Sequence, residues 1–348
     1  MDAELAEQVL ALASAPVQHR RYLRSLGSRE LLLTYAKRAD TPIAPSHVRH
    51  FQDWMRQPDC CYITIRDKTY PELLRQIDDP PLVLFVSGNA KLLQAPQVAI
   101  IGSRMASPIG LHTADYFARG LSQAGVVVSS GLATGIDGAA HRGALQQGTT
   151  LAVLANGTDV YYPPRHRQLQ QQIRQAGVLV SELPPGMPPK RGLFPRRNRI
   201  LSGLSSLVLI IEAKMRSGTM STAALANAQN KDVWVVPGSI WDVAFSGSFK
   251  LLKEGAGLAT SVDDILQELN LAPLPPSDGI TASAQINSSR SLANDQLLAN
   301  VGLEVTSVDT IVARSGLPIA IVTEQLVMLE LEGLVTSVPG GYIRMGRR

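Results

Sequence analysis

Residues 98–130, with the sequence VAIIGSRMASPIGLHTADYFARGLSQAGVVVSS, decide the fold of this chain. Val98–Ile101 and Val126–Ser129 are apolar runs whose length is typical of buried strands. Between them, Gly110–Gln123 has the length and composition of a helix. Because a helical crossover brings the chain back to the same end of the sheet, this order predicts two parallel strands in one sheet.

The same alternation of strand and helix extends over residues 69–271. Further strands are expected at Leu82–Val86, Thr150–Val153, Val178–Val180, Leu207–Ile211 and Val233–Val236, and further helices at Asp137–Gln147 and Met220–Gln229. The strands are short and mostly β-branched, as strands covered on both faces are. The pattern predicts an α/β fold with an extended Rossmann-like, doubly wound, mostly parallel sheet. Ligands of such sheets bind at the carboxyl ends of the strands, so the residues after each strand are the candidates for a site.

Smaller segments flank this core. Residues 1–68 are expected to form a small N-terminal helical domain, and residues 272–291, rich in Pro, Ser and Ala, a linker. Residues 292–348 predict a C-terminal winged-helix domain. Its elements are expected as a helix from Ser307 to Ala313, a helix from Pro318 to Leu331, and a hairpin of Leu334–Val338 and Tyr342–Met345.

Composition narrows the class of protein. Of 348 residues, 45% are hydrophobic and 18% are charged, which is ordinary for a globular protein. The only cysteines, Cys60 and Cys61, are adjacent, so they form no disulfide framework, and no histidine cluster nearby completes a zinc site. The first residues, MDAELAEQVL, are acidic where a signal peptide is basic, and the apolar runs are too short to span a bilayer. We therefore expect a soluble, cytoplasmic protein with no membrane partner, metal or cofactor.

The first candidate site follows strand Val98–Ile101. Gly102 lets a ligand approach the backbone, Ser103 supplies a hydroxyl, and Arg104 offers a forked donor for phosphate. A structural turn that carries a surface arginine is the alternative.

A glycine-rich loop, SGLATGIDG at residues 130–138, follows the next strand. Its spacing matches neither the dinucleotide-binding GxGxxG fingerprint nor a P-loop. Ser130, Gly131 and the amides after them are nevertheless expected to face an anion at the start of a helix. The alternative is that the glycines only allow tight packing of strand and helix. For Asp137 and His141, four residues apart, a structural role is favoured over catalysis or metal binding.

Two further strands are followed by loops suited to anions. Asn156 and Gly157 predict a turn with exposed amides. Ser217 and Gly218 open a helix, and Lys214 precedes them with a positive charge.

The stretch KRGLFPRRNR at residues 190–199 is the most informative for function. Five of its ten residues are basic and none is acidic. Arginine binds phosphate as a fork, and an aromatic ring stacks on an unpaired base of any kind. The stretch therefore predicts binding to single-stranded nucleic acid through Arg191, Phe194, Arg196, Arg197, Asn198 and Arg199. A solvated basic loop is the alternative.

Two other charge patterns bear on partners. The second helix of the winged-helix segment has no Lys or Arg but carries Glu324 and Glu330, with Glu332 just after it. Since DNA phosphates attract positive charge, this domain is expected to contact protein rather than DNA. Near the other end, His19, Arg20, Arg21 and Arg24 form a basic cluster, either a solvated helix face or an accessory nucleic-acid contact.

Several long motifs resemble the DprA/Smf family of DNA-processing proteins. They are TYPELLRQIDDPPLVLFVSGN at 69–89, GSR at 102–104, SGLATGIDGAAHRGAL at 130–145, the Tyr162-Pro163 turn, FPRRNRILSGLS at 194–205, EAKMRSGTMSTA at 212–223 and VPGS at 236–239. The resemblance implies an extended Rossmann core between a helical, SAM-like N-terminal domain and a winged helix. It also implies single-stranded DNA binding and protection, homodimerisation through the core, and loading of the RecA recombinase in natural transformation.

By matched position, the resemblance implies that three residues line a DNA pocket, namely Arg104, Arg191 and Phe194, with Gly102, Ser103, Gly131, Arg197, Asn198, Arg199, Ser217 and Gly218 around it. The chain departs from the family at His166 and Phe249, where the family usually has Asn.

An enzyme on the same fold is the competing hypothesis. Related Rossmann proteins hydrolyse nucleoside monophosphates with a glutamate in the helix after a glycine-rich loop. The matching segment, Ser217–Asn230, has no Asp or Glu, so we expect no catalysis. A nucleotide sensor that uses the same pocket remains a third possibility.

Overall fold

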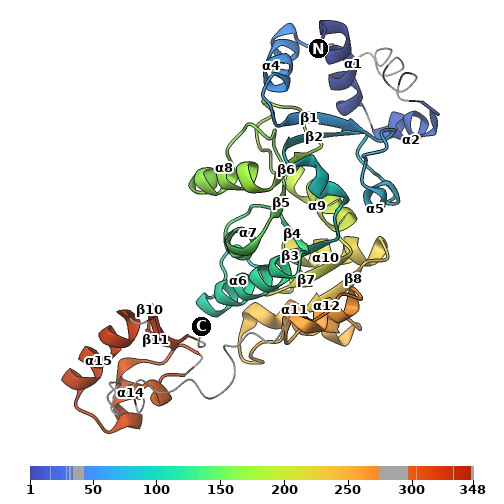
Figure 1. Ribbon diagram of the computed structural model, residues 1–348. Coiled ribbons are helices and arrows are strands. Elements are labelled where there is room, and N and C mark those ends of the chain that lie inside the picture. The colour runs from blue at the N-terminus through green and yellow to red at the C-terminus, as the bar shows by residue number, and fades with distance from the viewer. Residues whose placement is uncertain are drawn as a thin grey trace. The chain divides into compact units, whose positions relative to one another are not determined.

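The structure is a computed structural model that describes residues 1–15, 17–28, 30, 33, 43–273, 297–302, 304–331 and 333–345 (Figure 1). It divides into two units, Met1–Leu274 and Pro275–Arg348. The expected linker, residues 272–291, lies outside the described residues from residue 274 on, and Glu332 and the side chain of His19 also lie outside them.

Nine strands of the described chain form one sheet in the order β1-β2-β6-β5-β4-β3-β7-β8-β9 (Figure 1). They are β1 (Cys60–Thr64), β2 (Val83–Gly88), β3 (Gln97–Ile101), β4 (Val127–Ser130), β5 (Thr150–Val153), β6 (Val178–Ser181), β7 (Leu207–Ile210), β8 (Asp232–Val235) and β9 (Gly257–Leu258). From β6 through β9 neighbours run parallel, whereas β1 and β2 are antiparallel additions at one edge. The expected α/β fold with a mostly parallel sheet is confirmed.

The helices of the first unit lie on both faces of this sheet. They are α1 (Ala3–Ala13), α2 (Val17–Ser25), α4 (Pro45–Met55), α5 (Glu72–Arg75), α6 (Pro108–Gln123), α7 (Ile136–Gln147), α8 (Arg167–Ala176), α9 (Leu193–Leu204), α10 (Gly218–Ala228), α11 (Ser246–Lys253) and α12 (Val262–Glu268). Side chains of a strand alternate between faces. Val98 and Ile100 accordingly pack with α6, α7 and α12, while Ala99 and Ile101 pack with α9 and α10. This alternation gives the doubly wound arrangement.

Three elements of the first unit differ from the expectation. Only helices were expected before residue 69, yet Cys60–Thr64 forms β1, an edge strand paired with β2. The two-residue strand β9 is too short to leave a pattern in the sequence. The basic stretch, for which no helix was predicted, is largely helical, because α9 begins at Leu193.

The N-terminal helices share the core of the sheet. Phe51 and Trp54 of α4 are buried, and their rings lie 5.6 Å and 6.0 Å from the ring of Phe85 in β2. Burial of large aromatic side chains contributes much of the stability of such a contact. Helix α4 therefore packs against β2.

The second unit has its own core. Helices α14 (Val308–Ser315) and α15 (Ile319–Leu331) are followed by the antiparallel strands β10 (Val335–Val338) and β11 (Gly341–Arg344). Ile311, Val322 and Leu326 are fully buried among them. The expected order of helix, turn, helix and hairpin is confirmed.

No single helix in the described part of the chain is long and apolar enough to cross a membrane. Only α14 and α15 taken together pass that test, and they are bent by 111°.

Candidate nucleic-acid interface

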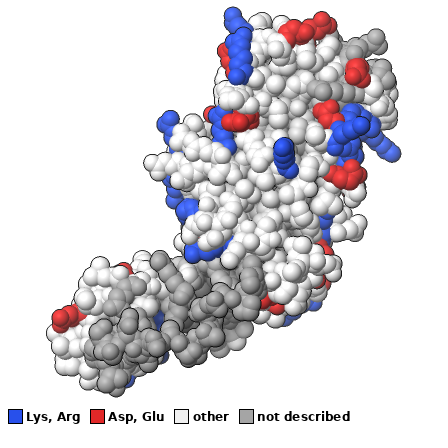
Figure 2. Space-filling model, viewed as in Figure 1, with Lys and Arg blue, Asp and Glu red and all other residues white. Residues whose placement is uncertain are grey.

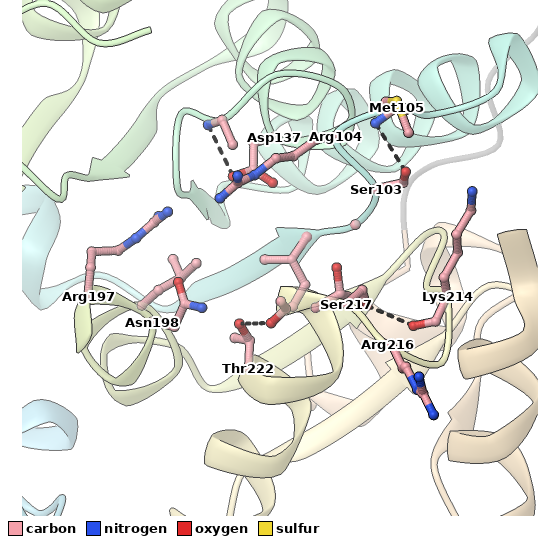
Figure 3. Close-up of a pocket in the computed structure, with 16 residues that line it drawn as sticks. Ser103, Arg104, Met105, Asp137, Arg197, Asn198, Lys214, Arg216, Ser217 and Thr222 are labelled. Atoms are coloured by element: carbon pink, nitrogen blue, oxygen red, sulfur yellow. Dashed lines mark hydrogen bonds between the residues drawn. The ribbon is translucent and has the colours of Figure 1, made fainter. Parts of the chain in front are cut away.

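Two adjoining cavities open at the carboxyl ends of the parallel strands, and Arg104 and Ala133 line both. We call them the paired cavities. The larger, of about 330 Å³, is surrounded by the loop after β3, by α9 and by the start of α10 (Figure 3); its polar lining is Ser103, Arg104, Asp137, Arg197, Asn198, Lys214, Arg216, Ser217, Thr219 and Thr222, with Gly102 and Gly218. The smaller, of about 210 Å³, is lined by residues that include Arg104, Gly131, Asn156, Tyr162, Arg165 and Phe194.

The loop after β3 is locked against the start of α7, and this exposes Arg104. A Cβ atom on Gly102 would lie 2.6 Å from Cγ1 of Ile136, so only glycine allows the two elements to approach this closely. The Ile136 amide donates to the carbonyl of Ser103 at 3.1 Å. Beyond this contact, the Ser103 hydroxyl accepts from the Met105 amide at 3.2 Å. The side chain of Arg104 is left exposed at the mouth of both cavities.

The guanidinium of Arg104 lies close to two aromatic rings, and the three side chains come from three separate segments of the chain. The guanidinium carbon of Arg104 lies 5.6 Å from the ring centroid of Phe194, at the start of α9. The ring of Tyr162, after β5, lies 5.5 Å from that of Phe194. Phe194 is half-buried, which holds its ring in place and leaves part of it open to a ligand. The arrangement therefore offers a stacking surface next to a forked phosphate donor.

The glycine-rich loop after β4 is held by a carboxylate of the protein itself. The amides of Gly131 and Ala133 both donate to Oδ2 of Asp137, each at 3.2 Å. The Ser130 hydroxyl donates to the carbonyl of Ile100 at 2.7 Å. Burial raises the pKa of Asp137, although Arg197 and these amides favour the charged form. The two amides expected for a phosphate are thus already bonded, and the structural role favoured for Asp137 is confirmed.

Arg197 is a buried support of this loop. Its Nη1 donates to the carbonyl of Val153 at 3.0 Å, and burial lowers its pKa while Asp137 acts in the opposite direction. A Cβ atom on Gly131 would lie only 1.7 Å from Nη1 of Arg197. Gly131 therefore makes room for the guanidinium, which joins the ends of β4 and β5 from beneath the larger cavity.

Helix α9 separates the other arginines of the basic stretch. Residues three apart share a face of a helix, and Arg196 and Arg199 both point toward Glu182. Nε of Arg196 lies 2.7 Å from Oε1 of Glu182, and Arg199 pairs with Oε2 of the same carboxylate and with Asp79. Neither arginine lines the paired cavities. Lys190 and Arg191 precede the helix, are exposed and also lie outside the lining.

The turn after β5 uses its polar groups internally. Asn156 is buried, and its amide nitrogen donates to the carbonyls of Gly157 and Val160 at 2.9 Å and 2.8 Å. The Gly157 amide donates to the carbonyl of Met187 at 2.9 Å. The expectation of an exposed amide at Gly157 is therefore wrong. The turn instead shapes the smaller cavity, which Asn156 lines.

The start of α10 is the most open anion site of the larger cavity. The Ser217 hydroxyl caps the helix by accepting from the Met220 amide at 3.4 Å and donates to the carbonyl of Lys214 at 2.8 Å. The first amides of a helix have no partner within the helix, and the helix dipole favours an anion there. Gly218, Lys214 and Arg216 are exposed beside them.

Other titratable groups near the strand ends are buried and form hydrogen bonds within the protein. Glu212 is buried, accepts from the amide and hydroxyl of Ser107, and burial raises its pKa. His141 is fully buried with Nδ1 2.7 Å from the Thr150 hydroxyl, and burial lowers its pKa to about 3. The favoured anchoring role of His141 is confirmed. Within the described ranges, no three His, Cys, Asp or Glu side chains are grouped to hold a metal ion.

Two sequence families match the chain in the order of its units. The family described as "DNA recombination-mediator protein A" matches residues 61–270, and the "DprA winged helix domain" matches residues 281–341. The chain belongs to the DprA/Smf family.

Relatives of known sequence or structure agree with this membership. Protein Smf of Escherichia coli K12 is 42% identical over 298 residues, which cover 84% of this chain and 80% of that protein. The X-ray structure of DprA from Streptococcus pneumoniae matches with a TM-score of 0.62 and 36% identity, covering 76% of this chain and 94% of that one. DprA from Helicobacter pylori, whose structure concerns its single-stranded DNA binding mode, matches with a TM-score of 0.55 and 33% identity over 60% of this chain and 95% of that one.

The two positions expected to depart from the family pattern, His166 and Phe249, lie outside the cavity lining. His166 is buried, with Nδ1 3.1 Å from the carbonyl of Leu132, and burial lowers its pKa. It therefore supports the glycine-rich loop, a contact that an asparagine amide also makes possible. Phe249 lies in α11 and is half-buried.

Sequence reasoning did not assign several side chains that line the paired cavities of this DprA/Smf chain, among them Tyr162, Arg165 and Thr222. Tyr162 carried a usable signal, because aromatic residues make up only 5% of the chain and this one follows the expected strand at Thr150–Val153. No comparable signal marks Arg165 or Thr222, whereas Arg216, like Lys214, adds positive charge next to Ser217 in the sequence.

Proposed function

We propose that this chain binds single-stranded DNA, without sequence preference and without catalysis, in the paired cavities. The observation that carries the proposal is Arg104, whose guanidinium lies 5.6 Å from the Phe194 ring and lines both cavities. A base stacks on the ring while the arginine binds the adjacent phosphate. Stacking accepts every base but requires an unpaired one, so single strands are preferred to duplex.

Further contacts are assigned by exposure and placement. Phosphates of the strand meet Lys214, Arg216 and the capped start of α10, and Asn198 adds an amide. The exposed Arg191 contributes long-range attraction from outside the lining. We leave Arg196 and Arg199 out of the interface because both pair with Glu182 and neither lines the paired cavities. Arg197, Ser130, Gly131, Asn156 and Gly157 position the loops rather than the strand.

The absence of catalysis rests on the carboxylates. Helix α10 carries no Asp or Glu, and Glu212 is bonded to Ser107. Asp137 is bonded to two loop amides, and His141 is buried away from the cavities. General acid–base catalysis needs a free group within reach of the substrate proton; Asp137 lines the larger cavity, but its Oδ2 already accepts from two loop amides, and Glu212 and His141 do not line the paired cavities.

We infer the partners of the chain from its family and from the surface of its second unit. Membership of the DprA/Smf family supports protection of incoming DNA, loading of the RecA recombinase and dimerisation through the core, in the cytoplasm. For the second unit we infer a protein contact. Helix α15 has no Lys or Arg and exposes Val327, Met328 and Leu331, at 46%, 50% and 79%.

One titration tests the proposal. Labelled single-stranded DNA, the same sequence as duplex, and mononucleotides are measured against the wild type and the double variant Arg104→Ala, Arg191→Ala. Arg56→Ala with Arg119→Ala is the charge-matched control, since neither residue lines the paired cavities. We expect a preference for single strands and a salt slope of about −0.7 per phosphate neutralised, shallower in the double variant.

Two results speak against the proposal. DNA affinity that is the same in the double variant and the control would remove the assigned site. Release of free base from a mononucleotide by the wild type would favour the nucleotide-hydrolysing enzyme instead.

A further inference from the structure

A separate, arginine-lined cavity of about 660 Å³ lies among α2, the turn after β1 and α5. It shares no lining residue with the paired cavities. We call it the arginine cavity; it is lined by Arg21, Arg24, Ser25, Ile65, Arg66, Arg75, Ile77, Asp78 and Pro80. Figure 2 shows Lys and Arg side chains gathered over this side of the molecule, with a few Asp and Glu side chains beside them.

The arginines of this cavity bond mainly to uncharged groups. Arg24 donates to the carbonyl of Asp78, and Arg66 donates to the carbonyl of Arg24. Arg75 donates to the carbonyl of Ile65 at 2.6 Å and forms an ion pair with the exposed Glu72. Carbonyl oxygens hold a guanidinium in place but do not cancel its charge. Among the described lining residues there are four arginines and one aspartate, so this part of the cavity wall carries a net positive charge.

The neighbouring Arg20, in contrast, lies close to carboxylates. It is buried and lies 3.7 Å from both Asp79 and Glu182. The neighbouring carboxylates, Asp79 and Glu182, thus pair with Arg20 and with the arginines of α9 and do not line the arginine cavity.

Two observations point to an anionic ligand. Among the described residues, the buried Nε of Arg66 has no hydrogen-bond acceptor, so this lining arginine is not fully satisfied by the protein. Arg21 of α2 lines the cavity and is exposed, so its guanidinium is accessible to a ligand from solvent.

We propose that the arginine cavity is a second phosphate-binding site, and that it takes phosphates of a single strand that extends beyond the paired cavities. This proposal rests on the proposed function. Helix α9 connects the two sites, because Phe194 in its first turn lines the smaller paired cavity and its Arg199 pairs with Asp79, the neighbour of Asp78 in the lining of the arginine cavity. Several separate guanidinium groups suit a polyanion with spaced phosphates better than one small phosphate.

The test uses the full chain with a short oligonucleotide, sufficient for the paired cavities, and a long one. Arg21→Glu is compared with Arg56→Glu, which makes the same charge change just after α4 at a side chain that is 77% exposed. We expect Arg21→Glu to weaken binding of the long oligonucleotide about threefold to tenfold and to make its salt slope shallower by about 0.7. Binding of the short oligonucleotide is expected to match the control.

Arg66→Lys is the second variant, because it keeps the charge but loses the planar fork. It should also weaken only the long oligonucleotide. Equal affinities in Arg21→Glu, Arg66→Lys and the control, for both oligonucleotides and for inorganic phosphate and a nucleoside monophosphate, would overturn the second site. Loss of only the small phosphate compounds would support the site with a free phosphate as its ligand.

The proposed function is scored separately in the same experiment. Arg104→Ala should weaken the short oligonucleotide, whereas Arg21→Glu should not. An Arg104→Ala variant that binds the short oligonucleotide normally, alongside a defective Arg21→Glu variant, would contradict the paired-cavity site and leave the arginine cavity standing.

Discussion

Phe194→Leu removes the aromatic face of the paired cavities but retains an apolar side chain of similar bulk. The ring is half-buried and lies against Tyr162 and Arg104, at 5.5 Å and 5.6 Å, so it has one open surface for a base. Stacking of one base contributes about 1–3 kcal/mol. The Kd for a single strand is therefore expected to rise about 5-fold to 150-fold. The substitution removes no charge, so the salt slope is expected to stay that of the wild type.

Fluorescence anisotropy with a labelled single strand, repeated over a range of salt concentrations, measures both quantities. Tyr116→Leu is the matched control, because Tyr116 is 49% exposed on α6 and does not line the paired cavities. An affinity equal to that of the control would refute the stacking role of Phe194. A weaker affinity with a shallower slope would refute the separation between stacking and phosphate binding.

Three predictions concern the supports of the site. Gly131→Ala is expected to lower the free energy of unfolding by about 1–3 kcal/mol, because the added Cβ atom meets Nη1 of Arg197 at 1.7 Å; urea denaturation tests this. Glu182→Gln is expected to cost about 3–5 kcal/mol in the same assay, since it leaves three nearby arginines without their shared carboxylate; an unchanged denaturation midpoint would contradict the buried ion cluster. For His141, the folded-state pKa of about 3 lies below the ordinary 6.5, so unfolding takes up a proton between these values and stability falls as the pH falls. The wild type should lose up to about 1.4 kcal/mol per pH unit more than His141→Gln over this range, and parallel stability curves would disprove it.

The core of the fold could be predicted because its strands are apolar and bounded by glycine turns. Val98–Ile101 and Thr150–Val153 are buried on both faces, so hydrophobic residues run without interruption and mark the strand. Edge strands lack this signature. Cys60–Thr64 is an edge strand that leaves Cys61 and Tyr62 half-buried, so its sequence does not separate it from the helices before it.

The residues of the site could be predicted from the sequence where they directly follow a strand. Arg104, Ser217 and Gly218 follow parallel strands, and the carboxyl ends of such strands share one edge of the sheet. The contacts of the individual arginines in the basic stretch could not be predicted in this way. Once α9 forms, neighbouring arginines point about 100° apart, and their partners depend on Glu182, which precedes the helix by a loop.

The central question is whether single-stranded DNA binds at Arg104 and the paired cavities or along the basic stretch as a whole. Arg104→Ala and Arg196→Ala each remove one positive charge, and Arg196 differs from Arg104 in being paired with Glu182 at 2.7 Å. The decisive measurement is the salt dependence of single-stranded DNA affinity for both variants, with folding checked by circular dichroism. We predict a slope shallower by about 0.7 for Arg104→Ala and an unchanged slope for Arg196→Ala. An equal change in both variants, or a larger one for Arg196→Ala, would contradict the assignment of the interface to the paired cavities.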